Sequence, residues 1–330
     1  MSVVLAEVWR GEVLECVHRG DAVVVDAGGE VVAAWGDPDK LVLPRSSAKM
    51  LQALPLVESG AADAAGLDAR RLALACASHE GAAMHTGAVA AWLADIGLGE
   101  RDLRCGAHMP KDADAYKSLL CSDTPPCQLH NNCSGKHAGF LTLGRHLRAG
   151  PEYVEVDHPV QKAVREAFED VTGMPSPTHA IDGCSAPNFA TTLRGLGRAM
   201  ARFAAATEDA AATRDRAAFR LVQAMMAHPE LVAGEGRACT ELMRAARGRA
   251  AVKTGAEGVF VAILPEAGLG IALKVEDGAT RASECAIAAL LVRYGALEAG
   301  DPAVKRRMNP TLRNWRGLTT GALRPGPELR

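Results

Sequence analysis

The sequence predicts an α+β fold, in which an antiparallel sheet formed by strands near both ends of the chain carries a large inserted helical lobe. Two observations lead to this prediction. Short runs rich in β-branched residues fill the first 35 positions and return at 258–275. Between them, Ala- and Leu-rich segments repeat with the period of an α-helix. We therefore expect a sheet lobe of residues 1–45 and 250–330, a mainly helical lobe of residues 46–249, and a functional site in the cleft between them.

Each predicted element rests on a local pattern. Alternating apolar residues predict strands at 3–8, 12–17, 22–26 and 31–35, then at 258–264 and 268–275, with Gly28-Gly29 as a turn. Apolar residues at helical spacing predict helices at 70–77, 87–98, 160–171, 193–206, 216–226 and 280–294. The tail from residue 305 to 330 carries many arginines, which indicates a solvated surface.

Composition excludes several classes of protein. The 330 residues are 48% hydrophobic and 23% charged, which is typical of a globular protein and not of a disordered one. The net charge of -2 gives no field that would attract nucleic acid or a membrane surface. No apolar run reaches the length of a membrane span, and Glu7 interrupts the first apolar run, where a signal peptide would need its core. Nine cysteines, an odd number, argue against a disulfide framework, so we expect a cytoplasmic protein.

The first candidate for chemistry is Ser46 with Lys49, at the start of a predicted helix. Residues three apart share one face of a helix, where a neutral lysine amine can take the serine proton. The motif alone is weak, because a capping serine followed by an exposed lysine is common.

Lys253-Thr254-Gly255, just before a predicted strand, is the partner motif of Ser-x-x-Lys in serine acyl-transfer enzymes of the penicillin-binding type. Ser78, in Ser78-His79-Glu80, stands between the two motifs along the chain.

Two cysteine-containing loops form the next candidate. One contains Cys133 and Lys136, and the other contains Asp182 and Cys184. Each loop is followed by a helical pattern, so we expect both cysteines near helix N-termini, where the thiolate is favoured. Two soft ligands suit zinc if a further ligand is present. Taken on their own, the residues favour two buried structural thiols over a zinc site.

Together these blocks resemble the rhizobial-type L-asparaginases over nearly the whole chain, from about residue 5 to about 325. The blocks that carry the resemblance are Arg45-Ser46-Ser47-Ala48-Lys49, Cys76-Ala77-Ser78-His79, His130-Asn131-Asn132-Cys133-Ser134-Gly135-Lys136-His137, Asp182-Gly183-Cys184-Ser185-Ala186-Pro187 and Lys253-Thr254-Gly255-Ala256-Glu257-Gly258. That family is similar in fold to serine β-lactamases and DD-peptidases.

The resemblance implies hydrolysis of L-asparagine to L-aspartate and ammonia by two Ser-Lys pairs. Ser46 would be the nucleophile with Lys49 as its base, while Ser78 and Lys253 would relay protons to the leaving amine or exchange roles with the first pair. Backbone amides near Ser46 would form the oxyanion hole.

The resemblance also implies a zinc site made by Cys133, Lys136 and Cys184, in which a lysine ligates as the neutral amine. Asp182 would hold a metal-bound water. For the substrate we expect Arg45 to meet the α-carboxylate and Asp182 or Glu80 to meet the α-ammonium, with His137 lining the same site. The family further suggests a homodimer.

Two other interpretations stay open. One is a glutaminase or a penicillin-recognising acyl-transfer enzyme of the same fold. The other is a catalytically silent module that binds zinc or a small ligand.

Overall fold

The computed structural model describes residues 1–330 and shows a mixed fold of helices and antiparallel sheet, as predicted. By its internal contacts the chain divides into two units. The sheet unit comprises residues 1–47, 191–205 and 241–330, and the helical unit comprises residues 48–190 and 206–240. The sheet unit thus includes two segments, 191–205 and 241–249, that the sequence pattern placed with the helices. No helix in either unit is both long and apolar enough to cross a bilayer.

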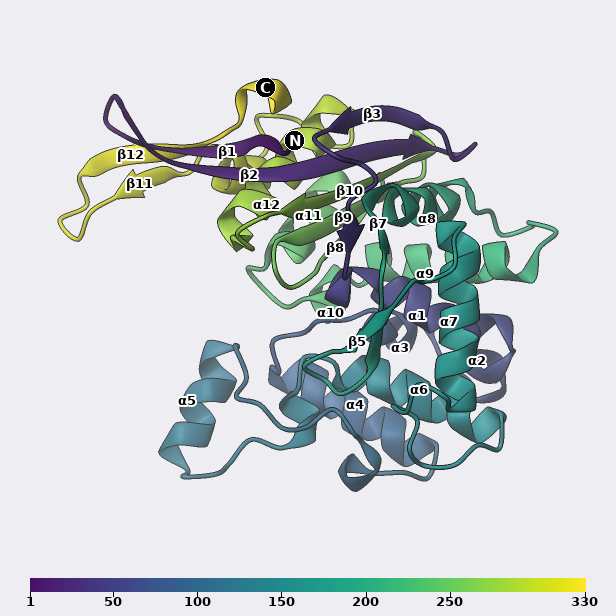
Figure 1. Ribbon diagram of the computed structural model, residues 1–330. Helices are drawn as coiled ribbons and strands as arrows, with labels where there is room; N and C mark the ends of the chain where they lie inside the picture. The colour runs from purple at the N-terminus through teal and green to yellow at the C-terminus, as the bar shows by residue number, and fades with distance from the viewer. The chain divides into compact units, whose positions relative to one another are not determined.

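The sheet unit is built on one antiparallel sheet with the order β11-β12-β1-β2-β10-β9-β8, and β3 pairs with β2 (Figure 1). Its strands are β1 (Val3–Arg10), β2 (Val13–Asp26), β3 (Val31–Trp35), β8 (Ala251–Thr254), β9 (Val259–Leu264), β10 (Leu269–Val275), β11 (Thr311–Arg313) and β12 (Thr319–Pro325). A separate two-stranded sheet is formed by β4 (Leu41–Val42) and β7 (Thr191–Thr192). Every residue of β9 is buried, which requires cover on both faces of the sheet.

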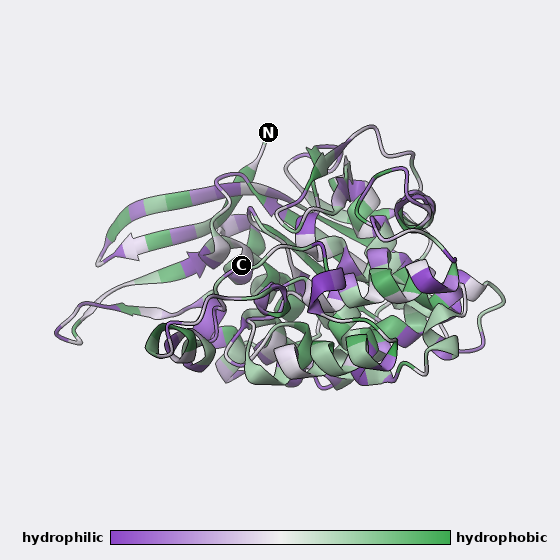
Figure 2. Ribbon diagram, turned by 90° about the horizontal axis from the view of Figure 1, so that it is seen from below, coloured by the Kyte–Doolittle hydropathy of each residue, from purple (hydrophilic) through white to green (hydrophobic).

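Two helices, α8 (Leu193–Ala205) and α12 (Thr280–Arg293), pack against that sheet. Close approach of α8 depends on glycine: a Cβ on Gly270 of β10 would stand 2.1 Å from the Ala201 nitrogen. The sheet unit also contains most of α11 (Ala238–Ala246), α13 (Pro302–Met308) and the short turn η4 (Pro327–Leu329). Figure 2 shows hydrophobic and hydrophilic residues alternating along the strands drawn at its left, the pattern of a sheet with two unlike faces.

The helical unit surrounds α1 (Lys49–Glu58), whose residues 49–57 are all buried. Around it pack α3 (Ala69–Ala75), α6 (Ser134–His146), α7 (Pro159–Thr172) and α9 (Thr213–Ala227). The indole of Trp92, on α4 (Ala83–Asp95), donates to the Thr142 hydroxyl of α6 at 3.1 Å. The remaining elements are α2 (Ala61–Ala64), η2 (Glu100–Asp102), α5 (Ala113–Cys121), η3 (Gln128–His130), α10 (Pro229–Val232) and the hairpin of β5 (His179–Ile181) and β6 (Pro187–Phe189).

Two expectations differ from the structure. Residues 12–17 and 22–26 belong to one continuous strand, β2, because Gly20 pairs with Val3 on one side and with Val275 on the other. The tail is not simply a solvated surface, since β12 pairs with β1 and Leu323 is only 4% exposed. Its arginines are not all solvated either, because Arg307 pairs with Glu241 and Glu284 and its side chain is 15% exposed.

Candidate active site

Ser46 lies on a short 3₁₀ turn, η1 (Arg45–Ala48), that runs directly into α1. Lys49 is the first residue of α1, so the backbone passes from a 3₁₀ turn to an α-helix between Ser46 and Lys49. Arg45 begins the turn with φ of +53°, in the left-handed region that side chains other than glycine seldom adopt. Such a conformation costs about 1–3 kcal/mol and tends to be kept at functional sites. The turn is therefore held in an uncommon shape at the expected nucleophile.

The Lys253-Thr254-Gly255 motif reaches the same turn within the sheet unit. A Cβ on Gly255 would stand 2.7 Å from the Pro44 carbonyl oxygen and 3.2 Å from the Ser47 nitrogen, so only glycine allows this approach. Lys253, on β8, is 1% exposed, and its Nζ donates to the Thr254 carbonyl at 2.9 Å. The sheet unit by itself thus places the Lys-Thr-Gly motif against the backbone that carries Ser46.

Lys49 is fixed within the helical unit. Its side chain is 1% exposed, and its Nζ donates to the backbone carbonyls of Ala77 and Asn132. Ala77 precedes Ser78 and Asn132 precedes Cys133, so one buried amine contacts both loops at residues next to the expected proton relay and the expected metal ligand.

His79 ties the same two loops together, a role that its sequence pattern did not indicate. Its backbone N–H donates to Asn132 at 3.2 Å. Its ring Nδ1 accepts from the Gly81 N–H at 3.1 Å, so the ring proton lies on Nε2, which is 2.9 Å from the Ser134 hydroxyl. Burial, with the adjacent His85 ring stacked at 4.8 Å, holds the pKa of His79 well below its ordinary value and keeps the ring neutral.

The predicted metal ligands meet in the helical unit. Cys133 caps the N-terminus of α6, and Lys136 lies in the first turn of that helix. Cys184 lies in the turn between β5 and β6, with its Sγ 3.1 Å from the Lys136 Nζ. All three side chains are buried. The expectation of two helix N-termini holds only for Cys133, because the chain after Cys184 continues as strand β6.

These three groups carry complementary charge. The Cys133 thiol donates to the Asn132 Oδ1 at 3.2 Å. The neighbouring Cys133 and the Lys136 charge lower the pKa of Cys184, whereas Cys184 and burial raise the pKa of Cys133. Burial alone would lower the pKa of Lys136, but Cys184 and Cys133 raise it above its ordinary value. The negative form of Cys184 and the positive form of Lys136 thus favour each other.

This donor set fits zinc on chemical grounds. Two sulfur atoms and one nitrogen converge in a buried site, and thiolates are the ligands that zinc prefers. No group of three or more His, Cys, Asp and Glu side chains in the chain is arranged to hold a metal. A zinc ion bound by Cys133 and Cys184 would therefore need the Lys136 amine as its third protein ligand.

Three residues expected to contact the substrate, Glu80, Asp182 and His137, have different hydrogen-bond or ion-pair partners. Glu80 pairs with Arg237 at 3.2 Å, and Asp182 accepts from the Gly183 N–H at 2.8 Å. His137 is fully buried, its Nδ1 lies 2.9 Å from the Tyr153 hydroxyl, and burial lowers its pKa to about 4. Its Nε2 is buried without a hydrogen-bond partner, and the nearby Cys184 opposes the fall in the pKa of the ring.

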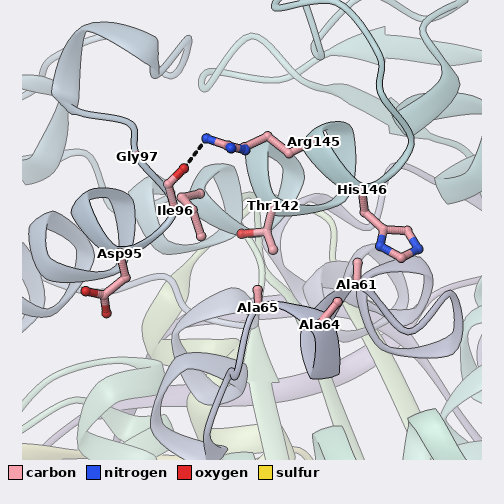
Figure 3. Close-up of a pocket in the computed structure, with 9 residues that line it drawn as sticks. All are labelled: Ala61, Ala64, Ala65, Asp95, Ile96, Gly97, Thr142, Arg145 and His146. Carbon is pink, nitrogen blue, oxygen red and sulfur yellow. Dashed lines mark hydrogen bonds between the residues drawn. The ribbon is translucent and has the colours of Figure 1, made fainter.

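A pocket of about 520 Å³ elsewhere in the helical unit contains none of these residues (Figure 3). Arg145 at its rim donates to the Ile96 carbonyl, and Asp95 pairs with Arg71. Because these charged side chains have partners within the protein, the pocket shows no chemistry of its own.

Comparison with known protein families identifies the family of this chain. The model of the family described as L-asparaginase II matches residues 6–325. The chain belongs to the L-asparaginase II family. No curated protein matches it.

Solved structures show similarity of fold. The structure of Mglu in its tris and glutamate form is 15% identical, with a TM-score of 0.50, and the match covers 91% of this chain and 65% of that one. A putative β-lactamase from Bacteroides dorei is 14% identical, with a TM-score of 0.43 and coverage of 78% and 84%. A β-lactamase from Mycobacterium bovis is 15% identical, with a TM-score of 0.36 and coverage of 83% and 94%.

Proposed function

We propose that the protein hydrolyses the side-chain amide of L-asparagine to L-aspartate and ammonia. Membership of the L-asparaginase II family supports this proposal. The observation that carries it is the buried Lys49 amine, held between the carbonyls that precede Ser78 and Cys133. The Lys49 side chain is 1% exposed, and Lys49 begins α1 three residues after Ser46.

In the proposed reaction, Ser46 Oγ attacks the amide carbon of asparagine and Lys49 takes its proton. The C–N bond then breaks, Ser78 and Lys253 deliver a proton to the nitrogen, and ammonia leaves. A β-aspartyl ester remains on Ser46 until water, deprotonated by the same base, hydrolyses it to aspartate and restores the hydroxyl. Proton transfers of this kind contribute about 10²- to 10⁴-fold to the rate.

The oxyanion would be stabilised by backbone N–H groups near Ser46. One such group, the Ser47 N–H, donates to the Pro44 carbonyl at 3.2 Å, so it is already engaged inside the turn. The Ser47 hydroxyl also donates to Pro44, at 2.7 Å. These bonds fix the shape of the turn, and we assign them to positioning Ser46.

We further propose zinc as the resident metal, held by Cys133, Lys136 and Cys184. When bound, zinc supplies a fixed positive charge that favours substrate binding, while the nucleophile is provided by Ser46. Asp182 and Arg45 are the residues we propose for the ammonium and carboxylate of the substrate. Glu80 is less suited to this role because Arg237 already pairs with it.

We propose a cytoplasmic homodimer. All nine cysteines are free thiols, which is typical of a reducing compartment. Exposed apolar side chains occur on β2 and in the loop between β11 and β12, among them Val13 at 67% and Trp315 at 106% exposure; we call these two segments the ribbon. Light scattering of the purified protein tests the dimer, and Trp315→Ser with Val13→Lys should shift it to monomer if the ribbon forms the contact.

The direct test of activity is ammonia release from L-asparagine and L-glutamine, with and without zinc, by the wild type and Ser46→Ala. We expect strong turnover of asparagine that the substitution abolishes. Faster turnover of glutamine, or hydrolysis of the β-lactam nitrocefin, would assign the alternative acyl-transfer activities. Binding of zinc and asparagine without release of ammonia would contradict catalysis and support a silent module.

A further inference from the structure

A second pocket, in the sheet unit, has an apolar floor and a basic rim. It encloses about 450 Å³, within the range of about 300–1,000 Å³ that small-molecule sites occupy. Its apolar lining comes from α12, α13, β12 and the segment after it, with the residues Ala289, Val292, Met308, Pro325 and Leu329. None of the proposed catalytic or metal-binding residues lines this pocket.

Three arginines form the rim: Arg293, Arg324 and Arg330. Arg330 is engaged by the Glu7 carboxylate. Arg293 and Arg324 form no salt bridge, and Arg293 donates only to the Glu328 backbone carbonyl. The pocket thus has two guanidinium groups that are not neutralised by a carboxylate.

Both of these guanidinium groups lie over tryptophan rings. The Arg293 Cζ is 5.2 Å from the centre of the Trp35 ring, and the Arg324 Cζ is 5.5 Å from that of Trp9. Stacking on an aromatic ring restricts a long side chain and leaves the N–H groups at its edge available. The two rim arginines are therefore positioned before any ligand arrives, which reduces the entropy cost of binding.

The lining contains no Asp or Glu side chain, and although Arg330 pairs with Glu7 and carries the terminal carboxylate, the guanidinium groups of Arg293 and Arg324 leave the lining with an excess of positive charge. A cationic ligand would be repelled, and a small inorganic anion would leave the apolar floor exposed. An elongated anion with a hydrocarbon body satisfies both parts, since its carboxylate can accept charge-assisted hydrogen bonds from arginine. From this complementarity we propose that the pocket binds a free, medium-chain acyl carboxylate, a ligand distinct from the proposed amide substrate.

Decanoate is the probe that tests this proposal. Calorimetric titration below its micelle concentration, together with tryptophan fluorescence, should show saturable binding to the full-length protein. The fluorescence should change because Trp9 and Trp35 lie under the two rim arginines. We expect 1-decanol, which lacks the charge, to bind at least tenfold more weakly, since a charge-assisted hydrogen bond contributes roughly this factor or more.

Arg324→Gln should weaken decanoate binding about tenfold and reduce its salt dependence. Arg316→Gln is the matched control, because Arg316 is an exposed arginine of the same sheet unit that does not line the pocket. Met308→Glu, which places a carboxylate on the half-buried floor, should abolish binding while far-UV circular dichroism stays unchanged.

The proposal is overturned if decanoate fails to bind the folded wild type, or if Arg324→Gln and Arg316→Gln bind it equally. Binding to anionic vesicles without binding to free decanoate would also overturn it, and would indicate a membrane surface instead. Loss of asparagine hydrolysis has no bearing on these outcomes, because the readout is binding at a separate pocket.

Discussion

Replacing Gly135 by alanine should separate α6 from α3 and disturb the proposed zinc site. Gly135 lies in the first turn of α6, between Cys133 and Lys136. A Cβ built on it would stand 2.4 Å from the Leu74 carbonyl oxygen and 3.0 Å from the Leu74 carbonyl carbon. Because these are backbone atoms of α3, no rotamer change relieves the contact, and the two helices must move apart.

The size of the effect follows from that distance. Forcing an extra methyl into a packed core costs typically about 1–3 kcal/mol of unfolding free energy. Gly144→Ala in the same helix is the matched control, since its Cβ would meet only the Val160 side chain at 3.6 Å, an ordinary contact. Alanine in a helix interior is favoured over glycine by about 0.5–1 kcal/mol, so this control should be neutral or stabilising.

Urea unfolding of both variants measures the difference, and zinc titration measures the site. We expect Gly135→Ala to lose about 1–3 kcal/mol and to bind zinc at least tenfold more weakly, while Gly144→Ala binds it normally. The result that would refute the reasoning is a Gly135→Ala variant as stable as Gly144→Ala with unchanged zinc affinity.

Three further predictions concern the buried amines and the histidine. Lys49→Met should lower kcat by about 10²-fold or more. The same substitution should lower the free energy of unfolding by about 1–3 kcal/mol, because the Ala77 and Asn132 carbonyls lose their donor. Ammonia release measures the first effect and urea unfolding the second. An unchanged kcat would contradict the role of Lys49. Burial holds the pKa of His79 well below its unfolded value of 6.5, so protonation favours the unfolded chain and stability should fall as the pH drops below about 6.5. Thermal unfolding between pH 7 and pH 5 should show this loss, and a His79→Gln variant with the same slope would assign it to other groups. Because neighbouring thiols raise the pKa of Lys136, zinc binding must displace a proton from this amine. Calorimetric titration with zinc in buffers of different ionisation enthalpy should therefore show proton release, and Lys136→Met should release fewer protons.

The sequence predicted the elements with strong local patterns. The helices at 160–171, 193–206 and 280–294 match α7, α8 and α12 within one or two residues, and the strands around the Pro265 turn match β9 and β10. These segments owe their structure to periodic apolar residues, which are visible locally. The family-level resemblance is likewise confirmed, because it rested on long motif blocks.

Features that depend on distant residues were not predicted. Residues 18–21 were left outside the strands predicted at 12–17 and 22–26, yet Asp21 is fully buried and its carboxylate accepts from the Asp37 N–H and from Lys40. Those partners lie 16 and 19 residues away. The ring partner of His79 lies 55 residues away, so no local spacing could show that this histidine joins two loops. The sequence indicated only that His79 belongs to the block Cys76-Ala77-Ser78-His79.

The central claim is that Ser46 is the residue acylated by asparagine. Rapid acid quenching of the protein during turnover, followed by peptide mass spectrometry, tests it most directly. The account predicts a β-aspartyl ester on the peptide that contains Ser46, absent in Ser46→Ala and retained when Ser78 is replaced by alanine. An ester on the Ser78 peptide instead, or turnover that persists in Ser46→Ala, would contradict the assignment of the nucleophile.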